Sequence, residues 1–181
     1  MFQDQINLQK ALDDKCAYLF HYNIYSDAND IKWVEENAPD ITEQDANGVT
    51  TTKDWRTQRS EDKPTCVVTI CIVETESGYR SGITSQHPKF DAWDRPKGNV
   101  IAFNRANDNT EHTNLNAIMK DIELELYRFL DKNGEVGCPQ CGHGAVRPVM
   151  TYRRNNEPIT VEQAVGYISG FISSKNTAAS Q

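Results

Sequence analysis

The chain has 181 residues, enough to bury a hydrophobic core without disulfide bonds, and its five cysteines are an odd number. No apolar run approaches the ~20 residues of a membrane span and no basic, apolar leader opens the chain, so we expect a reduced, cytoplasmic protein without membrane contact. The net charge of −7 lies in residues 1–62, which carry 13 acidic and 6 basic side chains, and this argues against a protein that binds nucleic acid by neutralising phosphates. The acidic excess favours a basic partner or serves solubility.

Two helices are predicted in the N-terminal part. Apolar residues follow one another at helical spacing over residues 3–20, which predicts one amphipathic helix, and they are Leu8, Leu12, Cys16 and Leu19. A short second helix over residues 31–37 would be capped by Asp30. Residues 39–63 are polar and contain the turn signal Asn47-Gly48, so we expect a surface excursion with an edge strand near residues 49–55.

The clearest strand covers residues 65–74, where both alternating faces are apolar, and it should be central in a sheet. The turn Glu76-Ser77-Gly78 leads into a second strand over residues 79–85, in which Gly82 weakens the strand or marks a close approach. Residues 99–105 could begin a helix or form a third strand, and we favour the helix.

The strongest helical pattern covers residues 114–130, and Gly134 is placed to end that helix. A strand over residues 145–152 follows. The pattern Thr160-Val161-Glu162-Gln163 is a capping box that starts a C-terminal helix, with a frayed tail from Ser173 onward.

These elements predict one α+β domain over residues 1–175, with an antiparallel β-sheet, a central hairpin packed by helices and a tail at 176–181. A subregion over residues 134–175 would contain a turn of the zinc-knuckle type.

That turn is Cys-Pro-Gln-Cys-Gly-His-Gly, residues 138–144. Its spacing suits two thiolate ligands of a structural zinc ion, and Cys138, Cys141, His143 and His112 form our candidate ligand set. His87 and Cys71 are further candidates, because linear spacing does not choose among them. Dithiol redox exchange and a turn without metal remain alternatives.

Residues 87–106 contain an aspartate and an aromatic residue followed by Arg-x-Lys-Gly-x-x-Ile-Ala-x-x-Arg-Ala. This segment resembles one found in small uncharacterised phage proteins, from which it departs at Trp93 and Pro96, and the resemblance implies a phage origin. The segment also looks like the end of a double-stranded RNA-binding fold, in which Arg95, Lys97 and Arg105 would contact phosphates. The alternative is that these cations are solvated and that Asp91 and Asp94 are caps rather than a carboxylate pair near His87.

The leading hypothesis is a non-enzymatic cytoplasmic protein, phage-encoded and located in the host, that binds a host protein and inhibits or redirects it; defence and transcription proteins are the favoured targets. Aromatic residues in polar loops and the acidic stretch supply the candidate contacts. These contacts are Trp55, Phe90, Trp93, Glu35, Glu36, Asp40, Glu43 and Asp45. The alternatives are a nucleic-acid-binding module and a zinc-dependent hydrolase with an open metal position. Homo-oligomers are open in each case.

Overall fold

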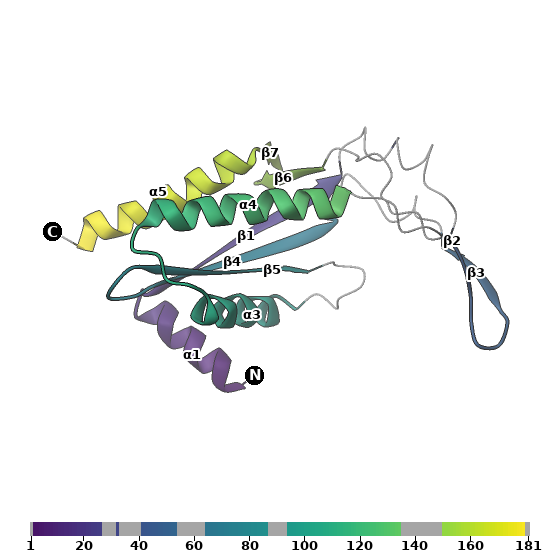
Figure 1. Cartoon of the computed structure of the whole chain (residues 1–181), viewed down its shortest axis with the longest axis horizontal. Helices are drawn as coiled ribbons and strands as arrows, with labels where there is room; N and C mark the ends of the chain where they lie inside the picture. Colours follow the sequence, from purple (N-terminus) through teal and green to yellow (C-terminus); the bar gives the residue numbers. More distant parts are fainter. Residues whose placement is uncertain are drawn as a thin grey trace.

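The structure is a computed structural model, and it describes residues 2–26, 32, 41–53, 64–86, 94–134 and 150–179. In this part of the chain, helices cover both faces of a five-stranded sheet, with α1 and α3 on one face and α4 and α5 on the other (Figure 1). The helices are α1 (Phe2–Asp13), α3 (Arg95–Asp108), α4 (Leu115–Gly134) and α5 (Val161–Ala179). The predicted α+β class is confirmed.

The sheet has the strand order β5-β4-β1-β6-β7, and each neighbouring pair is antiparallel. Its strands are β1 (Ala17–Ser26), β4 (Cys66–Glu74), β5 (Tyr79–Gln86), β6 (Met150–Arg154) and β7 (Glu157–Ile159). A separate two-stranded sheet consists of β2 (Ile41–Gln44) and β3 (Thr50–Lys53).

Strand β4 confirms the predicted buried strand. Each of its residues except Glu74 is buried, because helices cover both of its faces. Alternate side chains enter two different cores. Those that include Ile70 and Ile72 pack under α4 and α5, while those that include Cys71 and Val73 pack under α1 and α3.

The predicted helix over residues 3–20 is wrong in its second half. Helix α1 ends at Asp13, and Lys15 adopts a left-handed backbone conformation with φ 56°. The amide of Lys15 donates to Leu12 O, and the amide of Cys16 donates to Ala11 O. This pair of bonds is a Schellman motif, which reverses the chain after a helix. The chain then enters β1, the middle strand of the sheet.

The other predicted elements fall close to their places. Gln163 Oε1 accepts from the Thr160 amide and Thr160 Oγ1 accepts from the Gln163 amide, so the capping box forms as expected. Gly48 has φ +79°, which confirms the turn between β2 and β3. Helix α5 continues to Ala179, past the point where we expected the tail to begin. The predicted helix over residues 31–37 and the first part of the strand over 145–152 lie outside the described residues.

The described cysteines behave as structural side chains. Cys66 and Cys71 are buried as expected, and burial raises the pKa of the Cys71 thiol to about 12. Cys16 is only half-buried, and its thiol donates to Ala11 O at 3.3 Å. Among the helices that the structure describes, none combines the length and apolar character needed to cross a bilayer.

Gly82 marks a close approach between β5 and α3, which was one of the two interpretations of this glycine from the sequence. A Cβ atom on Gly82 would lie 2.1 Å from Ala102 O and 2.3 Å from Ala106 N. Both atoms belong to the backbone of α3, so they cannot move aside as a flexible side chain would. The absence of a side chain at Gly82 therefore sets how closely α3 approaches the sheet.

We predict that Gly82→Ala destabilises the fold by about 2 kcal/mol or more, because α3 must shift away from the sheet. Gly166→Ala is the matched control: Gly166 lies in α5 with open space around the missing Cβ. Alanine is the better helix former, so this control should stabilise the protein by about 0.5–1 kcal/mol. Urea unfolding of both variants measures the two effects, and equal stabilities would contradict the close approach.

Candidate binding groove on the open edge of strand β1

Both outer edges of the sheet, β5 and β7, are blocked. On β5, Arg105 Nη1 donates to Ile83 O at 2.6 Å and Asn109 Nδ2 donates to Ser81 O at 2.9 Å, so side chains occupy carbonyl groups that another strand would use. At the other end of the sheet, β7 is only three residues long and contains Pro158. Short strands, prolines and covering side chains are the usual means of preventing unwanted strand pairing.

One side of β1 is also open along part of its length, because β6 does not extend over it. Strand β6 pairs with β1 only over residues 23–26, and the chain then turns away at Asn155 and Asn156, whose φ values are 51° and 66°. Positive φ at both positions is the signature of a tight type I′ hairpin turn. Residues 17–22 of β1 therefore pair with β4 on one side and with no strand of the described chain on the other.

The backbone of this open edge presents hydrogen-bonding groups outward. Cys16 O accepts from the Glu74 amide, so even-numbered residues of β1 direct their backbone groups toward β4. Backbone direction alternates along an antiparallel strand, and the N–H and C=O groups of Leu19 and His21 therefore point to the open edge. The backbone groups of Ala17 point the same way, but Ala17 is only 3 % exposed, so it forms the inner end of the open edge.

A groove of about 510 Å³ runs along the open edge, and we call it the β1 groove. Helix α1 forms one wall of the groove and α5 forms another. The end of β6 closes the groove beside the β6–β7 hairpin. The lining residues are Leu12, Ala17, Tyr18, Leu19, Phe20, His21, Tyr22, Arg154, Tyr167 and Phe171.

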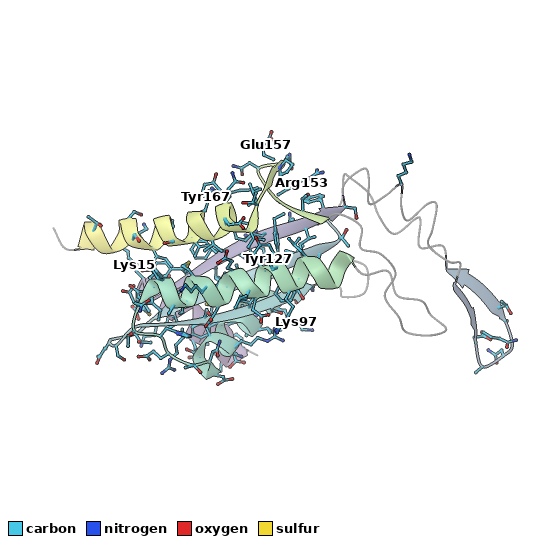
Figure 2. The ribbon with its side chains drawn as sticks, turned by 45° about the horizontal axis from the view of Figure 1, so that its top comes forward. Lys15, Lys97, Tyr127, Arg153, Glu157 and Tyr167 are labelled. Carbon is cyan, nitrogen blue, oxygen red and sulfur yellow. The ribbon has the colours of Figure 1, made fainter. Side chains whose placement is uncertain are left out.

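Aromatic rings form the α5 wall. The Phe171 ring meets Tyr18 and Phe20 edge to face, with centroid distances of 6.0 and 5.6 Å. Phe171 is nevertheless 44 % exposed and Tyr167 is 48 % exposed. Figure 2 labels Tyr167 on α5 and Arg153 and Glu157 on the β6–β7 hairpin. Large apolar side chains that are held in place and still exposed are typical of a contact surface.

Arg154 is the charged side chain that lines the groove. Its guanidinium carbon lies 3.8 Å from the centroid of the Tyr167 ring, which is a cation–π contact. Among the described residues no carboxylate forms an ion pair with Arg154, although Glu157 lies opposite it in the hairpin register. Arg154 is thus the one side chain with a fixed charge among the described residues that line the β1 groove.

His21 lies between the groove and α3, and its ring is uncharged. Nε2 lies 2.8 Å from Asn99 Oδ1, and Arg95 Nη2 lies 3.1 Å from Nδ1. Because a guanidinium only donates, Nδ1 must accept and Nε2 must carry the proton. Burial lowers the pKa of His21 below its usual value, the Arg95 charge lowers it further, and the bond to Asn99 partly opposes both effects.

The structure places some of the predicted site residues away from this groove. His112 Nε2 lies 2.9 Å from Asp121 Oδ2, and no group of three or more metal-ligating side chains occurs in the described part of the chain. Asp45 Oδ1 accepts from the amides of Asn47 and Val49, so its carboxylate stabilises the β2–β3 turn. Glu43 lies on β2.

Most other candidates fall outside the described residues, and their roles stay predictions. They are Cys138, Cys141, His143, His87, Trp55, Phe90, Trp93, Glu35, Glu36 and Asp40.

The three cations proposed for nucleic acid lie on α3. Arg95 contacts His21, and Arg105 donates to Ile83 O, so both contact the protein itself. The backbone amide of Lys97 donates to Asp94 Oδ1, and Asp94 thereby caps the N-terminus of α3. This arrangement favours a structural use of the α3 arginines.

Comparison with known proteins adds no assignment: no family model, no curated protein and no solved structure matches the chain. The groove itself is the feature that reasoning from sequence missed. The signal was present in Tyr18, Phe20 and Tyr22, whose alternation is typical of a strand.

We predict that His21 titrates below its ordinary pKa of about 6.5. A lowered folded-state pKa means that the neutral ring contributes stability above about pH 6.5, and that this contribution is lost as the pH falls through the folded-state value. NMR titration of the histidine rings measures it, with His21→Gln identifying the signal. In that variant, unfolding free energy should fall less between about pH 7.5 and about pH 5.5. A pKa at or above 6.5 would contradict the burial argument.

Proposed function

We propose that this chain is a binding protein whose β1 groove takes an extended segment of another protein. The open edge of β1 carries the proposal. Other edges of the same sheet are blocked, while Leu19 and His21 direct their backbone groups to an edge that no strand of the described chain covers, beside exposed aromatic rings. Addition of a strand to an exposed sheet edge is a recurring mode of peptide recognition.

The chemistry of the groove suits a peptide better than a small metabolite. Its floor offers the N–H and C=O groups of Leu19 and His21, which match the backbone of an extended chain. Its walls offer aromatic side chains on the α5 side and Leu12 on the α1 side, so alternate side chains of a strand would find apolar surfaces on both faces.

The kind of partner and its location are proposed from the sequence analysis. We propose that the partner is a host protein that the chain inhibits or redirects, with a phage as the source and the host cytoplasm as the place of action. The acidic residues 1–62 would add a second attraction for a partner with a basic surface.

The test is selection of peptides from a random peptide library on the immobilised protein. We predict that extended, apolar peptides are selected, and that Phe171→Ala weakens their binding about tenfold or more because it removes the ring that walls the groove. Leu124→Ala is the control: Leu124 is 68 % exposed on α4 and does not line the groove. Its binding should be unchanged. Failure to select any peptide, or an equal loss of peptide affinity in the two variants, would contradict the proposal.

A structural zinc ion at the knuckle of residues 138–144 belongs to the same proposal, as a support for the chain between α4 and β6. We predict one zinc per chain in native mass spectrometry of protein purified without chelator, and loss of that zinc in Cys138→Ser. Cys66→Ser is the matched control, because Cys66 is buried in the sheet. Protein that carries no zinc would remove both the structural site and the hydrolase alternative.

A further inference from the structure

We propose that the segment bound in the β1 groove runs antiparallel to β1 and places a carboxylate side chain beside Arg154. This inference rests on the proposed function and specifies its ligand. It comes from the register of the sheet and from the charge at one end of the groove.

The direction follows from β6. Strand β6 pairs with β1 in an antiparallel register that brings Asn23 opposite Arg153. The same register places Arg154 opposite Tyr22, after which the chain leaves the sheet at Asn155. A bound segment that continues the line of β6 would begin beside this turn and run toward Leu12. It would extend the antiparallel pairing of the sheet, which is slightly more stable per residue than parallel pairing.

The side-chain pattern follows from the register. Directly opposed residues in an antiparallel pair point to the same face of the sheet. Ligand side chains opposite Phe20 and Tyr18 would therefore face α5, whereas the side chain opposite Leu19 would face Leu12 of α1. Apolar side chains suit the positions opposite Tyr18 and Leu19, because aromatic and aliphatic groups surround them.

The position opposite Phe20 suits an acidic side chain. It is two places along the strand line from Arg154 and points to the same face, at the distance of successive side chains on one side of a strand. Arg154 is exposed and stacked on Tyr167, and no carboxylate of the described chain pairs with it. A planar guanidinium held over a ring in this way is prepared to bind a carboxylate.

The test uses two capped synthetic peptides, Thr-Glu-Val-Val-Ala and the same peptide with lysine in place of glutamate. We expect the wild-type protein to prefer the glutamate peptide by between about threefold and tenfold at low salt, and Arg154→Glu to reverse this preference. Arg128→Glu makes the same change in net charge on α4, away from the groove, and should leave the preference as in the wild type. Equal affinities of both peptides for the wild type would overturn the role of Arg154.

Methylation of the peptide backbone separates this inference from the proposed function. The residue opposite Leu19 directs its N–H toward β1, so methylation of the first valine amide should abolish binding. The second valine, opposite Tyr18, directs its N–H away, and methylation there should cost little. If both methylated peptides bind equally, the strand-addition function itself fails. If they differ but the charge reversal has no effect, only the carboxylate assignment fails.

A nitroxide on the peptide N-terminus tests the direction. In the antiparallel arrangement it should broaden the NMR signals of Arg154 and Asn155, and in a parallel arrangement those near Leu12. Sedimentation of the protein without peptide completes the test. A monomer is expected, whereas a dimer that dissociates in Phe171→Ala would show that a second copy fills the groove and would overturn the proposal.

Discussion

The burial of β4 on both faces is the constraint from which the rest of the architecture follows. An antiparallel sheet commonly leaves one face to solvent, but the side chains of β4 are apolar on both of its faces. Each face must therefore be covered by helices, α1 and α3 on one side and α4 and α5 on the other (Figure 1). With both faces covered, the parts of the described sheet that can meet a partner are its edges.

The treatment of those edges differs along the sheet, and the difference points to function. The β5 edge is covered by Arg105 and Asn109, and the β7 edge is short and carries a proline. An open edge favours aggregation and is usually covered, so the open part of β1 supports the proposed strand addition. The open half of β1 is flanked by exposed Tyr167 and Phe171, which would add buried apolar area to any strand that pairs there.

The sequence predicts those elements whose formation depends on local patterns. The apolar run of β4 and the capping box of α5 are recognised from single stretches of sequence, and the structure confirms both. Strand β1 was missed because Leu8 and Leu19 are spaced as if on one helix. Both do join the same core cluster, but from different elements. The helix ends at Asp13, and Lys15 just after it adopts a conformation that normally calls for glycine, so the usual sequence signal for a helix end is missing.

The open edge could not be predicted from the sequence for a different reason. It depends on where β6 pairs with β1, and residues far apart in the chain set that register through packing. Tyr152 illustrates this: it lies opposite Ile24 and donates its hydroxyl hydrogen to Leu126 O of α4 at 2.8 Å. Contacts of this kind fix β6 at one end of β1, and no strand of the described chain pairs with the other end on that side. Local sequence patterns do not predict such long-range contacts.

The groove is held in its open form by contacts that do not require a ligand. The Tyr22 hydroxyl donates to Ala164 O at 2.9 Å and ties β1 to α5 beneath the wall. The edge-to-face contacts of Phe171 and the stacking of Arg154 on Tyr167 fix the side chains that a ligand would meet. Ordering a rotamer-rich side chain at an interface costs about 0.5–1.5 kcal/mol, so groups that are already ordered leave more of the contact energy for binding. Preorganisation of this kind would favour the proposed binding of a short segment in a groove that offers few hydrogen-bonding groups.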